Sequence, residues 1–230
     1  MGTGARTAMH TGRRPMPTDP QLMTLVQWLS PAFPVGGFAY SHGLETAIAQ
    51  GHVQDAATLE AWLEDILRAG SGRSDAIWLR LAHGAVTSAD LLALDAEARA
   101  FIPARHRLME ADKQGVAFVR TLNTVWALDL PALLLPLAVG AGAARRDIGI
   151  DAVVPLYLQA FVSNLILAAQ RLMPLGQTEG QRILSRLGPV CLHVAGQTRG
   201  ATIADIHSTA FLSDIMAMRH ENLQPRVFQS

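Results

Sequence analysis

The sequence contains a single cysteine, Cys191, and a single lysine, Lys113, among its 230 residues. One cysteine allows neither a disulfide within the chain nor a zinc site built from several cysteines, and it is typical of a protein of the reducing cytoplasm. Because Lys113 follows Asp112 rather than glycine, the chain holds no phosphate-binding loop of the G-x-x-x-x-G-K-[ST] type. These absences argue against a P-loop nucleotidase and against a cysteine-based metal centre.

Charged residues are also scarce, at 17% of the chain, and 19 basic residues balance 19 acidic ones. A neutral chain lacks the long-range field that draws proteins to nucleic acid, so no DNA or RNA partner is expected. The apolar run 125–144 approaches the length of a membrane span, but Asp129, Pro131 and Pro136 interrupt it. We therefore expect a buried core helix there and no membrane role.

Hydrophobic residues make up half of the chain, and their period is helical nearly everywhere. Residues 56–69 carry one apolar stripe, with Asp55 placed to cap the start of a helix and Gly70 to end it. Ser88 is the expected N-cap of a helix that must end before Pro103. Thr178 and Gln181 have the spacing of a capping box at the start of a later helix.

No alternating run of β-branched residues is long enough to predict a sheet. The pattern therefore predicts a single all-α domain of about eight to ten helices. We expect a disordered tail over residues 1–20, the helical domain over 21–212 and a C-terminal segment that binds a partner over 213–230.

The segment SPAFPVGGFAYSHGLE, residues 30–45, combines turn residues with an unusual amount of hydrophobic surface. Gly36 and Gly37 are explained by a turn that needs a positive φ, and no strand or basic residue accompanies them as in a phosphate-binding nest. Ser41 is better placed to cap the following helix, with Glu45 in its first turn, than to act as a nucleophile with its neighbour His42.

The histidines show none of the i, i+3 or i, i+4 spacings that bring two metal ligands to one helix face, and Cys191 and His193 are only two residues apart. No catalytic residue, bound cofactor or metal site within the chain is expected. The segment SDIMAMRHENLQPRVFQS, residues 213–230, carries Met, Arg and Phe residues of the kind that anchor interfaces. Docking of this segment on its own core is the alternative interpretation.

Four blocks of the chain together resemble the urease accessory protein F (UreF) family. These blocks are the segment 30–45, the acidic helix VQDAATLEAWLEDIL, the stretch AAQRLMPLGQTEGQRIL and the ending DIMAMRHENLQPRVFQS, where Arg226-Val227-Phe228 stands in place of the Arg-Leu-Phe usual in the family. The resemblance implies an all-α, non-enzymatic protein that forms a homodimer. It also implies three partners: a UreD (UreH)-type scaffold, a UreG-type GTPase and apo-urease, into which the assembly inserts nickel. A role in controlling the GTPase is left open.

The resemblance places the partner-binding surface in the two unusual segments. In the first, the turn residues set the backbone path and the aromatic side chains form a surface that a partner or a second protomer covers. The expected contact residues are Phe33, Pro34, Gly36, Gly37, Phe38, Tyr40, Ser41, His42, Glu45, Met218, Arg219, His220, Glu221, Arg226 and Phe228.

Two alternatives from other functional classes remain. One is a small helical enzyme that uses Ser41, His42 and Glu45. The other is a nickel carrier that uses His42, His220 and Glu221.

Overall fold

The computed structural model describes residues 19–230, and within this range the chain folds into ten α-helices and three short 3₁₀ helices without a strand. The prediction of an all-α fold with about eight to ten helices is thus confirmed. The helices are α1 (Asp19–Trp28), α2 (Leu44–Ala49), α3 (Ala56–Ala69), α4 (Ser71–Gly84), α5 (Ser88–Phe101), α6 (Arg105–Trp126), α7 (Leu135–Arg145), α8 (Ile150–Leu172), α9 (Gln177–Gln197) and α10 (Phe211–Arg219), with 3₁₀ turns η1 (Gly37–Ala39), η2 (Ile203–Asp205) and η3 (His220–Asn222).

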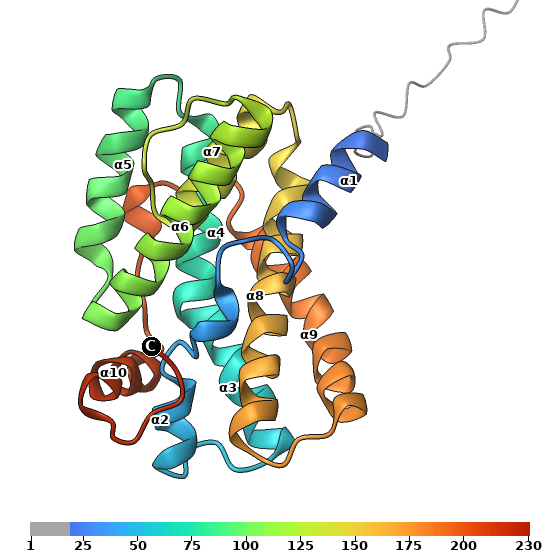
Figure 1. The fold of residues 1–230 in the computed structure, drawn as a ribbon, viewed down its shortest axis with the longest axis vertical. Coiled ribbons are helices and arrows are strands. Elements are labelled where there is room, and N and C mark those ends of the chain that lie inside the picture. The colour runs from blue at the N-terminus through green and yellow to red at the C-terminus, as the bar shows by residue number, and fades with distance from the viewer. Residues whose placement is uncertain (1–18) are drawn as a thin grey trace, which may run out of the picture.

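Helix α8 occupies the centre of the bundle and packs against α9, α4, α7, α3 and α2 (Figure 1). Its apolar sequence agrees with that position, since side chains on several of its faces meet other helices. Helix α4 packs against both α3 and α7. At Gly140 of α7 an added Cβ would lie 2.3 Å from the carbonyl oxygen of Leu79, so the two helix backbones touch there.

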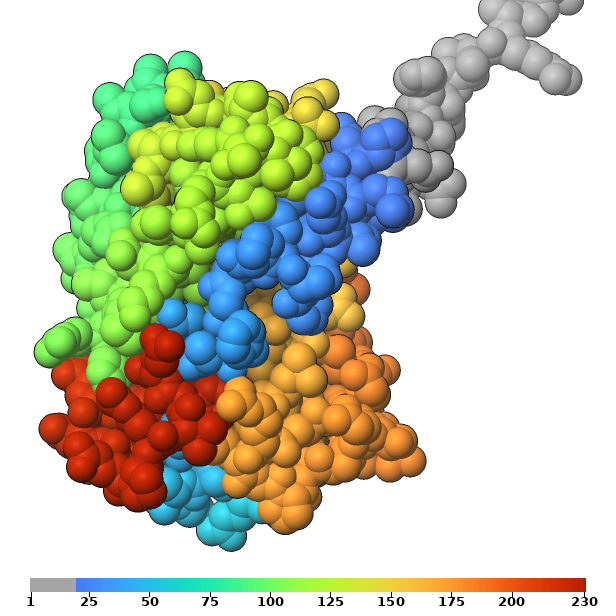
Figure 2. All heavy atoms as spheres, in the orientation of Figure 1, coloured from blue at the N-terminus to red at the C-terminus, as the bar shows by residue number. Residues whose placement is uncertain are grey.

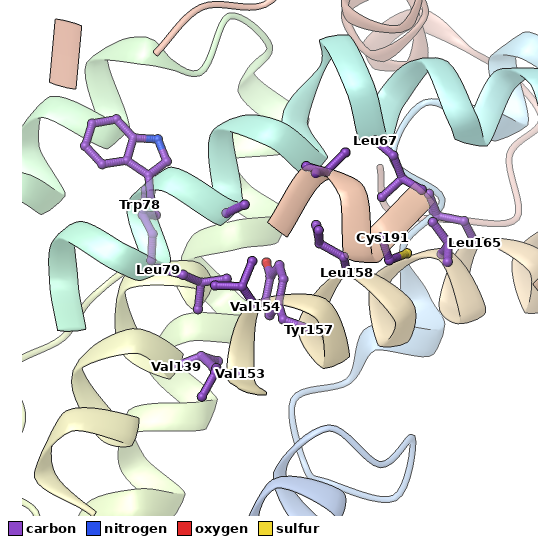
Figure 3. Close-up of a cluster of buried hydrophobic side chains, with 14 of the residues drawn as sticks. Leu67, Trp78, Leu79, Val139, Val153, Val154, Tyr157, Leu158, Leu165 and Cys191 are labelled. Atoms are coloured by element: carbon purple, nitrogen blue, oxygen red, sulfur yellow. The ribbon is translucent and has the colours of Figure 1, made fainter. Parts of the chain in front are cut away.

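The core is continuous across these helices. Figure 3 shows Leu79 of α4 close to Val154 of α8, with Val139 of α7 and Val153 of α8 beside them. The predicted apolar stripe of α3, which is Leu59, Trp62, Leu63, Ile66 and Leu67, is buried as a whole. A buried aliphatic side chain of this size stabilises a fold by roughly 1.5–3 kcal/mol, so this stripe is a main anchor of α3.

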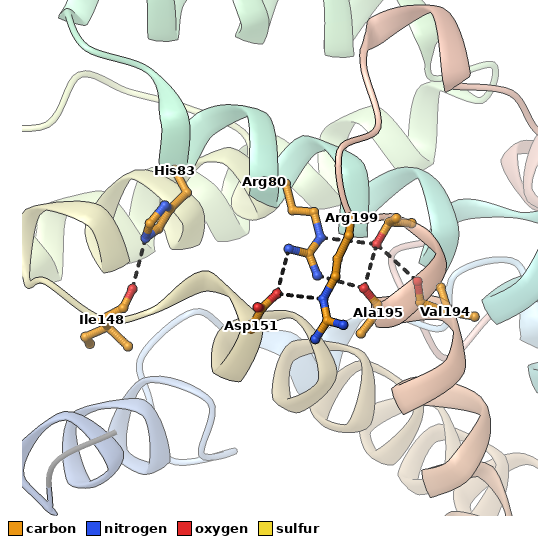
Figure 4. A network of polar contacts seen from close by, with 8 residues as sticks. Arg80, His83, Ile148, Asp151, Val194, Ala195 and Arg199 are labelled. Atoms are coloured by element: carbon orange, nitrogen blue, oxygen red, sulfur yellow. Dashed lines mark hydrogen bonds and ion pairs between the residues drawn. The ribbon is translucent and has the colours of Figure 1, made fainter. Parts of the chain in front are cut away.

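A polar network joins α4, α8 and α9 at one end of this core (Figure 4). Arg80 of α4 donates to Asp151 at 3.1 Å and to the carbonyl of Ala195 at 2.7 Å, and Arg199 donates to Asp151 at 3.2 Å. Burial alone would raise the pKa of Asp151, but these two guanidinium groups hold that pKa below its usual value. The ion pairs therefore fix the relative positions of three helices.

The structure confirms some helix boundaries and corrects others. Asp55 caps α3 as predicted, and Gly70 follows its last residue. The N-cap of α5 is Thr87, in a capping box with Asp90, so the prediction for Ser88 was wrong by one residue. The capping box predicted at Thr178 and Gln181 is absent, because α9 begins at Gln177 after Gly176. Helix α9 runs unbroken through Gly188 and Pro189.

The apolar run 125–144 is only partly helical. Helix α6 ends at Trp126, and the chain becomes helical again only at Leu135, where Pro136 lies in the first turn of α7. Pro136 and most of the following side chains of α7 are buried, so the segment is a core element as predicted.

Helix α8 is the one described helix that is long and apolar enough to cross a membrane. Half of its most apolar window is buried inside the fold, and a core helix of a water-soluble protein passes the same test of length and composition. It is therefore not a clear membrane span.

The predicted segment boundaries fall inside helices. Residues 1–18 of the predicted N-terminal tail lie outside the described residues, while Asp19 and Pro20 belong to α1. The boundary between 212 and 213 lies within α10, and this helix packs on α2.

Candidate functional site

The two unusual segments of the sequence meet on one face of the molecule. Figure 1 shows α10 and the following residues beside α2, and Figure 2 shows the same red atoms bordering the blue atoms of the N-terminal segment. The amide of Gln229 donates to the carbonyl of Ala39 at 2.8 Å, and the amide of Ser41 donates to the carbonyl of Ser230 at 3.0 Å. We call residues 211–230 the tail segment.

Glu45, in the first turn of α2, holds the tail segment in place. One carboxylate oxygen accepts the amide of Val227 at 2.6 Å, and the other accepts the amide of Phe228 at 3.0 Å. The second oxygen also accepts Nε2–H of His220 at 3.1 Å. Glu45 and His220 are both buried, so these bonds form in a weakly polar environment where they are strong.

Ser41 also connects the two segments. Its hydroxyl oxygen accepts the amide of Glu45 at 3.3 Å and donates to the carbonyl of Ser230. The N-cap residue of α2 is Gly43, at a φ of 81°, yet the Ser41 oxygen still satisfies an amide of the first turn, as a capping residue does. An added Cβ at Gly43 would lie 2.8 Å from the amide nitrogen of Ala217, so only glycine allows α10 to approach so closely.

His42 has partners from other parts of the chain. Its Nδ1 lies 3.3 Å from Glu110 of α6, and its Nε2 lies 2.8 Å from the hydroxyl of Ser71, the first residue of α4. Burial and nearby Arg107 lower the pKa of His42, so the ring is neutral, donating from Nδ1 to Glu110 and accepting from Ser71. The order Ser71–His42–Glu110 is that of a hydrolase triad.

The structure does not bring together the enzyme centre considered from the sequence. Ser41 is bonded to Ser230, the carboxylate of Glu45 is bonded to the tail segment, and His42 points to Ser71 and Glu110. Ser71 and Glu110 were missed as site residues, because they lie 29 and 68 positions from His42 and no local motif marks them.

A cavity of about 380 Å³ adjoins His42 and Ser71. Its polar wall includes Asp75 and Arg107, and its apolar wall includes Phe211 and Ile215 of α10. Burial raises the pKa of Asp75 to about 6, although the hydroxyl of Tyr157 donates to it at 2.8 Å. The Nη1 of buried Arg107 has no hydrogen-bond partner among the described residues, so the cavity holds polar groups that water or a ligand can satisfy.

The three residues proposed for a nickel carrier lie in separate networks. His42 contacts Ser71 and Glu110, His220 contacts Glu45 and His106, and Glu221 accepts the amide of Arg105 at 3.1 Å. Over residues 19–230 no group of three His, Cys, Asp or Glu side chains is placed to hold a metal ion. Cys191 is buried, and burial raises the pKa of its thiol to about 11.

The expectation that the aromatic residues of segment 30–45 form an exposed surface is wrong for two of the three. Phe33 is buried against Phe118, with ring centroids 5.1 Å apart, and Tyr40 is buried as well. Phe38 is 79% exposed and is the aromatic residue of this segment that a partner can reach. Gly36 has a φ of 70°, which confirms the turn interpretation, and Gly37 begins η1.

The tail segment likewise has a buried and an exposed side. Phe228 and His220 are buried, and the guanidinium of Arg171 lies 4.4 Å above the Phe228 ring. Met218, Arg219 and Arg226 are exposed. Val227, which the sequence interpretation left out, is 61% exposed. The rest of the predicted set differs in burial. Pro34 is exposed, Gly36, Gly37 and Glu221 are half-buried, and Ser41, His42 and Glu45 are buried. Their role in partner binding stays a prediction.

Comparison with known proteins identifies the family. The family model named UreF matches residues 53–188. A urease accessory protein UreF from Cereibacter sphaeroides is 52% identical over 209 residues, which cover 91% of this chain and 98% of the relative. Proteins of the same name from Roseobacter denitrificans and Jannaschia sp. are 45% and 44% identical, over 96% and 100% of this chain and 99% and 100% of the relatives. The chain therefore belongs to the UreF family of urease accessory proteins.

Proposed function

We propose that this protein is a cytoplasmic, non-enzymatic adaptor of urease maturation. In this proposal a homodimer of the chain links a UreD (UreH)-type scaffold and a UreG-type GTPase to apo-urease, so that nickel is inserted into the urease active site. The adaptor works by presenting surfaces to its partners, and it has no bound cofactor of its own.

The observation that supports this proposal most is that the two segments, which backbone hydrogen bonds join, both carry exposed side chains. Five side chains of these segments are exposed: Phe38, Met218, Arg219, Arg226 and Val227. Hydrogen bonds to other parts of the fold nevertheless hold the backbone of both segments in place. Glu45 holds the amide of Val227, and Arg171 donates to the carbonyl of Phe38 at 2.7 Å. We call these five side chains the contact patch. A fixed patch with aromatic, methionine and arginine side chains loses little conformational entropy on binding and suits a protein partner.

Two substitutions in the contact patch test this proposal. Phe38→Ala and Arg226→Ala are each expected to weaken capture of a UreD-type partner by about 2 kcal/mol, or roughly thirtyfold in Kd, as for hot-spot residues. Neither side chain is buried, so the free energy of unfolding should change by less than about 0.5 kcal/mol. Surface-bound UreD-type protein and purified variants give the Kd directly.

Leu192→Ala is the matched control, because Leu192 lies on α9 and is 65% exposed. It should leave the Kd unchanged. Equal binding by all three variants and the parent protein would place the interface elsewhere. Deletion of residues 213–230 is a less selective test, because it would uncover Glu45 and remove buried Met216, His220 and Phe228.

A further inference from the structure

The cavity beside His42 and Ser71 has the size and the apolar wall of a small-molecule site. Its volume of about 380 Å³ falls in the range of roughly 300–1,000 Å³ that is usual for such sites. Phe211 of α10, which belongs to the wall, is 67% exposed, so solvent reaches this part of the wall. Five aromatic side chains line the cavity: Trp78, Phe101, Tyr157, Phe161 and Phe211.

Arg107 of α6 places a buried cation in this wall. Only 8% of the residue is exposed, and its Nη1 has no hydrogen-bond partner among the described residues. Glu110 attracts the guanidinium electrostatically. The two oxygens of that carboxylate, however, are engaged by His42 and Ser230. A buried donor without an acceptor costs free energy, so an acceptor brought by a ligand would stabilise Arg107.

The charges of the wall restrict the kind of ligand. Within residues 19–230 the lining holds three carboxyl groups, Asp75, Glu110 and Asp214, against one guanidinium. The pKa of Asp75 is raised to about 6, mainly by burial, and a cation beside this carboxyl would oppose that shift. A purely anionic ligand would be repelled by the carboxylates, and a purely cationic one would leave Arg107 without an acceptor. The wall therefore favours a ligand that carries both an anionic and a cationic group.

We propose that this cavity binds a free α-amino acid with a large apolar side chain. The ligand carboxylate accepts from Arg107, and its ammonium group donates to Asp75. These two residues already attract each other electrostatically, which places opposite charges in one region of the wall. The apolar side chain of the ligand packs among the aromatic residues. The site does not depend on the proposed adaptor role, because binding to the isolated chain tests it alone.

Equilibrium dialysis of the full chain against radiolabelled L-phenylalanine tests the proposal. We expect one molecule per chain, with a Kd of about 1 mM or below for a ligand of this size. Two unlabelled analogues separate the charged groups: L-phenylalaninamide lacks the carboxylate, and N-acetyl-L-phenylalanine lacks the ammonium group. Each should compete at least about tenfold more weakly than unlabelled L-phenylalanine, because one charged hydrogen bond is lost.

Arg107→Met tests the protein side of the same contact. Methionine keeps the apolar stem and removes the guanidinium, so the affinity should fall at least about tenfold. Replacing a buried charge by an apolar side chain is often neutral for stability, and urea denaturation checks that this variant is folded. Arg120→Met is the matched control, because Arg120 lies exposed on the same helix, and it should bind L-phenylalanine as the parent protein does.

Four results would each overturn the proposal. They are the absence of saturable L-phenylalanine binding to the parent protein, as expected if the cavity holds water only, equal competition by the two analogues and L-phenylalanine, unchanged affinity in folded Arg107→Met, and loss of binding in Arg120→Met. If Arg107→Met does not fold, the two analogues still decide the question on the parent protein.

Discussion

Replacement of Glu45 by alanine is expected to abolish urease activation and to lower the free energy of unfolding by about 3 kcal/mol. The substitution leaves the amides of Val227 and Phe228 and Nε2 of His220 without their acceptor. The tail segment then loses its attachment to α2, and the contact patch loses its fixed geometry. Urea denaturation gives the stability change, and urease activity in cells that depend on this protein gives the functional one.

Glu64→Ala is the control for the loss of a carboxylate. Glu64 pairs with Arg68 one helical turn away on the solvent-facing side of α3, and both side chains are more than a third exposed. Such a pair contributes about 0.3–0.5 kcal/mol, so this variant should resemble the parent protein in both assays. A Glu45→Ala protein that activates urease normally would show that the tail segment does not need to be fixed.

Asp75→Asn is expected to make the protein more stable at pH 8 and to leave it nearly unchanged at pH 4. The pKa of Asp75 is raised from 3.8 to about 6 in the folded protein, mainly by burial. The folded state therefore binds this proton more tightly than the unfolded state, so unfolding free energy falls as the pH rises from about 4 to about 6. The shift corresponds to at most about 3 kcal/mol above pH 6.

Asparagine carries no charge and still accepts the hydroxyl of Tyr157, so it removes this penalty. Urea midpoints at pH 4 and pH 8 measure the effect. Asp151→Asn is the matched control of opposite sign, because the pKa of Asp151 is lowered by Arg80 and Arg199. Its contribution is present above pH 3.8 and lost below, so Asp151→Asn should be less stable at pH 8. Equal stability of Asp75→Asn and the parent at pH 8 would contradict the assignment for Asp75.

Features set by neighbouring residues were predictable from the sequence. The apolar stripe and caps of α3 depend on one helical period, and both were predicted correctly. The start of α5 was missed by one residue because serine is by itself the stronger N-cap residue, whereas Asp90 selects Thr87 by completing the capping box.

The candidate site depends on contacts between distant residues, which the sequence does not show. Glu45 binds amides more than 180 positions away, at Val227 and Phe228. Phe33 and Tyr40 lie close to turn residues, so the sequence suggests that they are exposed. In the fold, α6 and the tail segment help to bury segment 30–45. From the sequence His42 likewise suggests a partner for its neighbour Ser41. In the fold its ring contacts Ser71 and Glu110 instead.

The geometry of Ser71, His42 and Glu110 gives the most direct test of the central claim, which is that this protein acts through its surfaces and catalyses no reaction. Ser71→Ala removes the only hydroxyl that could serve as nucleophile in this triad and should cost about 1–2 kcal/mol of stability. Urease activation in cells should stay within about twofold of the parent level if the triad is merely a buried polar network. Loss of activation by a folded Ser71→Ala protein that still binds its partners would contradict the claim.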